Sequence, residues 1–251
     1  MADSSKRSST VRARAAGSRR PARQSSAAGK PRAAAQALLP QGDVTLTDRA
    51  YAELEELIVT LQLPPGTALS ELVLAKRLDI GRTPIREALQ RLSRDGLVNI
   101  LARRGVLVSE IDLRAQLRLL EVRRELERLM ARGAAERATS EQRAQFSEIA
   151  AGMRRAAEKS DDLLFMRLDH QFNTLISAAS RNEFASRAMG LMHGLSRRFW
   201  YQHYKEAADL PLAARLHADV AEAIAERRVD AAGAASDSLI DYIESFARST
   251  L

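Results

Sequence analysis

Apolar side chains recur at three- and four-residue spacing from residue 47 onward, which predicts that most of the chain is helical. Leu63-Pro64-Pro65-Gly66 ends the first helix, because proline lacks the amide that would continue it and disfavours helical geometry in the residue before it. Five side chains share the buried face of this first helix: Tyr51, Leu54, Leu57, Ile58 and Leu61.

Two further short helices follow. One is predicted near 71–78, and Asp79-Ile80-Gly81 forms the turn after it. In the next helix Thr83 is expected to cap the start with its hydroxyl and Pro84 to take the first helical position, and Gly96 ends it. The buried face of that helix carries Ile85, Ala88, Leu89 and Leu92.

A single β-hairpin follows, with strands at 97–101 and 106–109 on either side of Ala102-Arg103-Arg104-Gly105. The fold class is therefore mainly α: an N-terminal winged helix-turn-helix at 44–111 and then an all-helical bundle of about six helices at 112–251. The six amphipathic helices are expected near 113–138, 141–159, 161–180, 183–206, 211–228 and 230–248.

Composition narrows the function classes. The chain has no cysteine, which excludes disulfides, a thiolate zinc site and a cysteine nucleophile. No apolar stretch is long enough to cross a membrane, and the N-terminus lacks the apolar segment of a secretory signal. The sequence predicts a cytoplasmic protein without a membrane partner.

The positive charge is concentrated at the N-terminus. Residues 1–43 hold nine Lys or Arg and two Asp, which accounts for the whole net charge of +7, and they contain almost nothing to bury. We interpret them as a disordered basic arm. Either the arm raises non-specific DNA affinity or it is an idle solubilising extension, and the sequence leaves both open.

The third helix has the pattern of a DNA-reading helix. Arg82 and Arg86 lie four residues apart at its start, and the guanidinium fork of arginine matches guanine O6 and N7. Thr83 could contact a phosphate. From Arg82 to Arg104 six arginines face only two acids, a local excess in a body that is otherwise neutral.

The hairpin extends this surface. Arg103 and Arg104 lie at its tip, and Gly105 permits a tight turn close to a nucleic-acid backbone or minor groove. An amphipathic helix alone is more often a solvated surface helix. The preceding turn and the following wing favour DNA binding.

The segments LPPGTALSE (63–71), LAKRLDIGRTPIREALQRLSRDGLV (74–98) and RRGVLV (103–108) closely resemble the DNA-binding domain of the GntR family. Family members usually carry Ser or Thr where this chain has Gly81, and some carry Arg where it has Leu72. The resemblance implies a transcriptional regulator, but these two departures prevent transfer of an operator sequence.

The C-terminal half resembles, more loosely, the all-helical FCD ligand-binding domain of the FadR subgroup. The resemblance rests on LLEVRRELE (119–127), DHQFN (169–173), Asn182 and LHADVAEAIAE (216–226). It implies a cavity that holds a divalent metal and a small carboxylate effector. In that family an Asp, a His four residues later and two further His bind the metal.

In this chain only Asp169 and His217 match those ligands. Asn173 stands at the second position, and Asp241 is aligned with the last. Spacing places Asp169 and Asn173 on one helical face, so these residues could hold one divalent metal ion of unknown identity. The alternative is a metal-free pocket in which they are hydrogen-bonding partners.

Arg123 matches the arginine of the family pattern and is assigned to the effector carboxylate, with Asp169, Asn173 and His217 as further effector-binding candidates. It could also be a surface arginine beside Glu127. His170, His193, His203, Arg197 and the Phe199-Trp200-Tyr201 cluster are left out of the site, because single histidines and aromatic clusters are mostly structural.

The sequence therefore predicts a homodimeric regulator, not an enzyme, that binds a palindromic operator in double-stranded DNA and responds to a small organic acid. A two-fold dimer is expected because one short helix reads too few bases. Two alternatives are a constitutive dimeric DNA-binding protein without an effector and a helical metalloenzyme.

Overall fold

The computed structural model describes residues 45–103 and 105–250. Its first element is helix α1 (Leu46–Val59). Thr45 caps α1, because its hydroxyl accepts the amide of Asp48 at 3.1 Å. Helices α2 (Glu71–Leu78) and α3 (Arg82–Arg94) follow. The expected basic arm at 1–43 lies outside the described residues.

Helix α3 begins two residues earlier than the sequence suggested. Gly81 is the N-cap, so Thr83 is the second helical residue and does not cap the helix. Pro84 is the third helical residue and not the first. It is still tolerated there, because the first four amides of a helix have no partner within the helix.

The wing is a three-stranded antiparallel sheet in the order β1-β3-β2, formed by β1 (Ala68–Leu69), β2 (Val98–Leu101) and β3 (Gly105–Val108). Val106 of β3 pairs with Leu69 on one side and Ile100 on the other. The sequence predicted the hairpin but not β1, because a two-residue strand has no detectable alternation.

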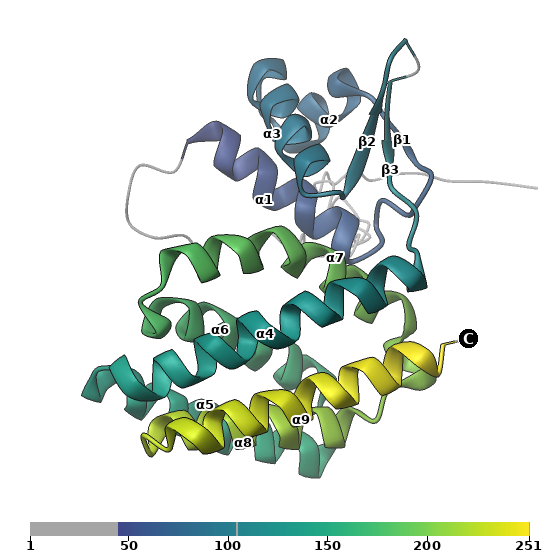
Figure 1. The fold of residues 1–251 in the computed structure, drawn as a ribbon. Coiled ribbons are helices and arrows are strands. Elements are labelled where there is room, and N and C mark those ends of the chain that lie inside the picture. Colours follow the sequence, from purple (N-terminus) through teal and green to yellow (C-terminus); the bar gives the residue numbers. More distant parts are fainter. Residues whose placement is uncertain (1–44, 104, 251) are drawn as a thin grey trace, which may run out of the picture. The chain divides into compact units, whose positions relative to one another are not determined.

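Six helices form the C-terminal half, close to their expected ranges, so the mainly α fold with a winged helix-turn-helix is confirmed. Figure 1 shows α4 and α9 running side by side, and these two helices contact each other extensively, as do α5 and α8. The bounds are α4 (Leu113–Arg137), α5 (Ser140–Lys159), α6 (Asp162–Ser180), α7 (Glu183–Ala207), α8 (Leu210–Ala225) and α9 (Val229–Arg248).

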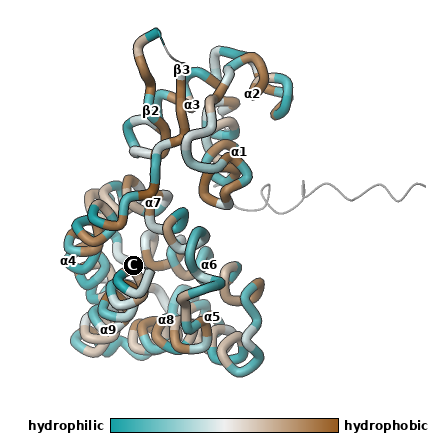
Figure 2. Tube along the Cα trace, turned by 90° about the vertical axis from the view of Figure 1, so that its right-hand side faces the viewer, coloured by the Kyte–Doolittle hydropathy of each residue, from teal (hydrophilic) through white to brown (hydrophobic). Residues whose placement is uncertain are grey.

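Each half has its own hydrophobic core. The buried faces of α1, α2 and α3 meet the sheet around Leu54, Ile85 and Leu92. In the C-terminal half the core lies among α4, α5, α6, α8 and α9, with Phe146 and Ile224 fully buried. Figure 2 shows hydrophobic segments where α5 and α8 lie together. Within the described ranges, no helix is long and apolar enough to cross a membrane.

Candidate functional site

The two arginines predicted to read DNA point outward from the start of α3. The side chain of Arg82 is 63% exposed and that of Arg86 is 58% exposed. Glu71, the first residue of α2, holds both: its carboxylate accepts from Nε of Arg86 at 2.9 Å and from Nη2 at 2.7 Å, and lies 3.7 Å from Nη2 of Arg82. Glu71 therefore fixes the direction of the Arg86 fork.

Hydrogen bonding to Arg86 lowers the pKa of Glu71, so the carboxylate stays ionised. Two of the donor nitrogens of Arg86 are used by this contact, and Nη1 is left for a base edge or phosphate. A glutamate that orients an arginine reduces the conformational entropy lost on binding DNA.

Three polar contacts anchor the C-terminal end of α3 to α1. The hydroxyl of Tyr51 donates to Asp95 at 2.8 Å, and the guanidinium of Arg91 lies 3.9 Å from the centre of the Tyr51 ring. Arg91 also contacts Asp48 at 3.3 Å. These contacts hold the C-terminal end of α3 and leave its N-terminal arginines exposed.

The other predicted DNA contacts also lie on the surface of the winged domain. Thr83 and Arg103 are exposed. Gly105 has φ +90°, and nothing lies within 4 Å of the position that a Cβ would occupy, so the turn is open. Arg104 lies outside the described residues.

A cavity of about 100 Å³ lies among α4, α6, α7, α8 and α9. A second cavity of about 320 Å³ adjoins it and shares part of its wall, including Asn173 and His193. All four predicted effector residues line the first cavity: Arg123, Asp169, Asn173 and His217. Aromatic side chains form much of the remaining wall: Phe165, Phe172, Phe199, Trp200, Tyr201, Tyr242 and Phe246.

The buried His217 and the half-buried Asp169 form an ion pair with 3.1 Å between Nε2 and Oδ1. The other ring nitrogen of His217 lies 2.8 Å from the carbonyl of Ala213, and the amide of Asn173 donates to Oδ1 of Asp169 at 3.0 Å. Burial alone would raise the pKa of Asp169, but the hydrogen bond and charge of His217 lower it to about 2. Burial alone would lower the pKa of His217, but Asp169 raises it.

Arg123 lies in the cavity wall with only 11% of its side chain exposed, so it is not an ordinary surface arginine. Its guanidinium already has a partner there. Nε donates to Oε1 of Glu127 at 2.6 Å, and Nη2 lies 2.5 Å from the same oxygen. A ligand carboxylate at Arg123 would have to share the guanidinium with Glu127.

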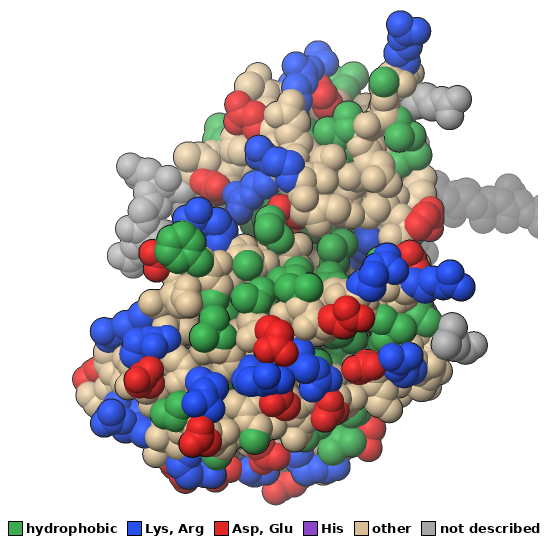
Figure 3. Space-filling view, viewed as in Figure 1, with side chains coloured by type: hydrophobic (Ala, Val, Ile, Leu, Met, Phe, Trp, Pro, Cys, Tyr) green, Lys and Arg blue, Asp and Glu red, His purple; other side chains and the backbone are tan. Residues whose placement is uncertain are grey.

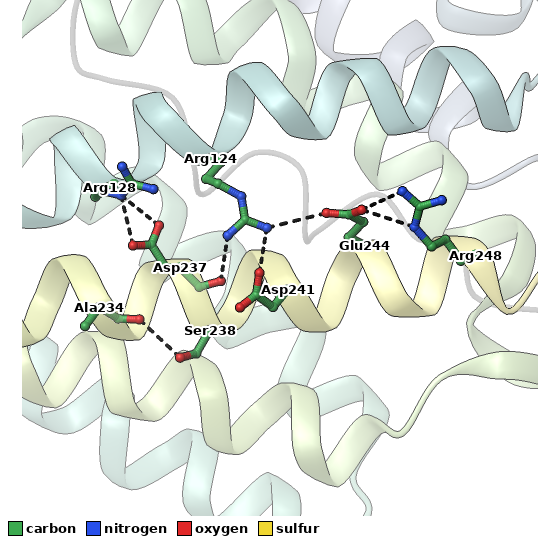
Figure 4. A network of polar contacts seen from close by, with 8 residues as sticks. All are labelled: Arg124, Arg128, Ala234, Asp237, Ser238, Asp241, Glu244 and Arg248. Carbon is green, nitrogen blue, oxygen red and sulfur yellow. Dashed lines mark hydrogen bonds and ion pairs between the residues drawn. The ribbon is translucent and has the colours of Figure 1, made fainter.

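Asp241 does not join the other proposed metal ligands. It lies on the outer face of α9 with 68% of its side chain exposed, and it pairs with Arg124 of α4 at 2.7 Å (Figure 4). In the same network Arg128 binds Asp237 at 2.8 Å. The α9 side chains that do line the cavity are Leu239, Tyr242, Ile243 and Phe246.

The donor set does not fit a metal centre. Asp169 and His217 are brought together, but α9 contributes apolar side chains and Tyr242 to the cavity, and Asn173 directs its amide nitrogen at Asp169. Across 45–103 and 105–250 there is no group of three or more His, Cys, Asp or Glu that could hold a metal ion.

Residues of α7 that were not predicted as site residues also belong to the cavity wall. His193, Arg197, Trp200 and Tyr201 all line it. Their spacing of four, three and one residues places them on one helical face. This spacing can be seen in the sequence, but it does not show that the face borders a cavity. Burial lowers the pKa of His193 to about 4, so this imidazole is neutral near pH 7.

Two buried polar atoms of the cavity wall have no hydrogen-bond partner among the described residues: Oγ of Ser196 and Nε1 of Trp200. An unpaired buried donor costs free energy unless water or a ligand satisfies it. Both residues line the cavity, but these two atoms themselves have almost no accessible surface and lie behind the cavity wall.

Two family models match this chain. Residues 46–108 match "Bacterial regulatory proteins, gntR family", and residues 118–242 match the FCD domain. The chain belongs to the GntR family of bacterial regulatory proteins. It is a DNA-binding transcriptional regulator with an FCD domain. Members of these families and the relatives of this chain are transcriptional regulators and not enzymes, so the metalloenzyme alternative was wrong.

Two curated relatives are described as a transcriptional repressor and a transcriptional regulator. The chain is 29% identical over 187 residues to the HTH-type transcriptional repressor RspR of Escherichia coli strain K12, which covers 74% of this chain and 82% of RspR. It is 26% identical over 172 residues to the Nta operon transcriptional regulator of Aminobacter aminovorans, covering 68% of this chain and 80% of that protein.

Solved structures show the same fold. Escherichia coli McbR/YncC is similar with a TM-score of 0.72 and 20% identity, covering 82% of this chain and 99% of that chain. A GntR regulator from Rhodococcus sp. RHA1 is similar with a TM-score of 0.61 and 21% identity, covering 82% of this chain and 98% of that one.

The four histidines of the chain provide a test of the cavity. In an NMR titration of the imidazole resonances, we expect His193 to titrate near pH 4 and His217 to titrate above 6.5. Burial is the cause for His193 and the Asp169 carboxylate for His217. Similar midpoints near 6.5 for both residues would contradict the cavity geometry described here.

The free energy of unfolding should depend on pH with opposite signs for His217 and His193. Because the folded pKa of His217 is raised, its ion pair stabilises fully below pH 6.5 and weakens as pH rises through that folded pKa, whereas Asp169 stays ionised down to about pH 2. The free-energy difference between wild type and His217→Gln should therefore be larger at pH 6 than at pH 9. His193→Gln should instead relieve a loss of stability between pH 6.5 and 4.

Proposed function

We propose that this regulator binds a palindromic operator as a cytoplasmic homodimer of the FadR subgroup, and that a small carboxylate effector in the FCD cavity modulates this binding. The observation that carries the effector assignment is the composition of the cavity wall, which is largely aromatic and contains the two arginines Arg123 and Arg197. Ligand sites of this kind combine apolar walls with a few polar groups.

In the DNA complex, Arg82 and Arg86 contact base edges in the major groove and Thr83 contacts a phosphate. Their exposure at the start of α3 supports this assignment, as does the contact of Glu71 with the Arg86 fork. Arg103, Arg104 and Gly105 follow the backbone or minor groove from the wing.

Exposed apolar side chains support the dimer. Val122 and Leu129 lie seven residues apart on α4, 51% and 47% exposed, and Leu191 on α7 is 52% exposed. Helices α4 and α7 contact each other, and Figure 3 shows hydrophobic side chains gathered over them. Contiguous exposed apolar surface of this kind typically marks a protein interface.

The effector is held by direct hydrogen bonds and not through a metal ion. Arg123 contacts its carboxylate while still paired with Glu127, and Asp169, Asn173 and His217 complete the polar wall. The Asp169–His217 pair supports this proposal, since each group already has a partner of opposite charge.

For DNA reading, we expect Arg86→Ala to weaken operator binding by about 1 to 3 kcal/mol, with a much smaller loss on random DNA. The matched control is Arg94→Ala, which removes the same charge from the exposed last turn of α3. Fluorescence anisotropy at fixed salt measures both. Equal losses on operator and random DNA would make Arg86 a phosphate contact.

For the effector, thermal denaturation with a panel of organic acids should identify stabilising carboxylates, because a ligand that binds only the folded state raises its melting temperature. Arg123→Ala should remove this stabilisation and leave operator binding intact. Arg124→Ala is the control, since that neighbouring arginine pairs with Asp241 outside the cavity.

A chelator should leave the melting temperature unchanged, and elemental analysis should find less than one divalent ion per chain. Retention of one ion per chain, lost in His217→Ala, would overturn the metal-free pocket. An undiminished acid response in Arg123→Ala would overturn the role of Arg123.

A further inference from the structure

Helix α7 contacts the ligand cavity on one side and the winged domain on another. Gly194 lies close to the winged domain: a Cβ there would lie 2.9 Å from Oε1 of Glu55 on α1 and 3.0 Å from Cδ1 of Leu97. The next residue, Leu195, packs against the hydrophobic core of the winged domain. Any group on α7 that reaches both sides can link ligand binding to the position of α1.

Arg197 reaches both sides. It lines the cavity, and its Nη2 lies 3.2 Å from Oε2 of Glu56 on α1. Its side chain is 22% exposed, whereas that of Glu56 is 49% exposed. Burial alone would lower the pKa of Arg197, but attraction to Glu56 and Glu55 outweighs burial and raises it.

The two arginines of the cavity differ in how their charge is matched. The partner of Arg123 is Glu127, itself in the cavity wall. Among the described residues the only carboxylate within ion-pair distance of Arg197 is Glu56, which does not line the cavity. On the cavity side Arg197 is also attracted by the carboxylate of Asp169, which is itself paired with His217, and its neighbours on α7 are neutral groups.

We propose that Arg197 is an anion-binding residue of the cavity and is shared with the winged domain, so that a carboxylate ligand and Glu56 compete for one guanidinium. This inference rests on the proposed carboxylate-sensing function and adds the residue that transmits it. Ligand binding then withdraws a cation from α1, which is the helix that anchors α3.

The charge of Glu55 on α1 is also compensated by Arg197. Burial raises the pKa of Glu55, and Arg197 is the leading group that opposes this effect. When Arg197 turns to a ligand, Glu55 has less compensation for its charge beside Gly194, and the contact between α1 and α7 weakens. The ligand class is an anion with an apolar body, since Phe165, Phe172 and Trp200 face the same cavity.

Benzoate and its neutral isostere benzamide are suitable probes, with binding measured by calorimetry on the whole chain. If Glu56 competes for Arg197, then Glu56→Gln should bind benzoate about two- to fivefold more tightly than wild type, as expected for removal of a partly exposed ion pair. Glu53→Gln is the matched control, because Glu53 lies on the same helix and pairs only with Arg49 at 2.7 Å among the described residues. It should leave benzoate affinity unchanged.

Arg197→Gln should weaken benzoate binding by about tenfold or more, since it removes a charged hydrogen-bond donor. In hydrogen exchange, benzoate should speed exchange of the α1 amides in wild type, and benzamide should not.

Benzoate binding of equal strength in wild type, Glu56→Gln and Arg197→Gln would overturn the role of Arg197 while leaving the carboxylate pocket intact. Failure of benzoate to bind wild type, together with no response to any acid in thermal denaturation, would instead overturn the proposed pocket itself and this inference with it.

Discussion

The buried guanidinium of Arg198 joins the two halves of this molecule. Its residue is 3% exposed, and burial lowers its pKa to about 10. It has no carboxylate partner within ion-pair distance in the described ranges, and its charge is instead solvated by oxygens of the segment between β3 and α4. Nη1 donates to the carbonyl and hydroxyl of Ser109 at 2.9 and 3.0 Å, and Nη2 donates to the carbonyl of Glu110 at 3.2 Å, whereas Nε has no partner among the described residues.

This arrangement constrains the rest of the fold. A buried charge is tolerated only where hydrogen bonds satisfy it, so α7 and the connecting segment must keep this register. Ser109 in turn donates its hydroxyl to the carbonyl of Gly96 at 2.6 Å, at the end of the turn that follows α3. Arg198 of the FCD domain thereby fixes the segment that leads from β3 of the winged domain to α4. Its neighbour Arg197 extends from the same turn of α7 toward Glu56.

Much of the fold could be predicted from the sequence, because helices with a strong apolar period and the turn at Pro64-Pro65 carry local signals. Strand β1 could not, since two residues owe their conformation to pairing with β3. The start of α3 was misplaced because Thr83 has the chemistry of a cap, whereas Gly81 occupies the cap position.

The site was harder to predict than the fold. Asp169, Asn173 and His217 were chosen from a pattern, and the structure brings them together. Asp241 lies on the side of α9 opposite to the cavity-lining Leu239 and Ile243. Each of these is two residues away, and two residues along a helix turn a side chain by about 200°. His193 and Arg197 were left out because their spacing reveals a shared face but not the cavity that this face lines.

Calorimetric unfolding of the whole chain shows directly whether α7 makes the winged domain and the FCD domain one cooperative unit. Wild type should unfold in a single transition whose calorimetric and van't Hoff enthalpies agree. Arg198→Ala should separate it into two transitions, because the connecting segment loses its hydrogen bonds to α7. Two separate transitions in the wild type, or one unchanged transition in Arg198→Ala, would contradict this coupling by Arg198.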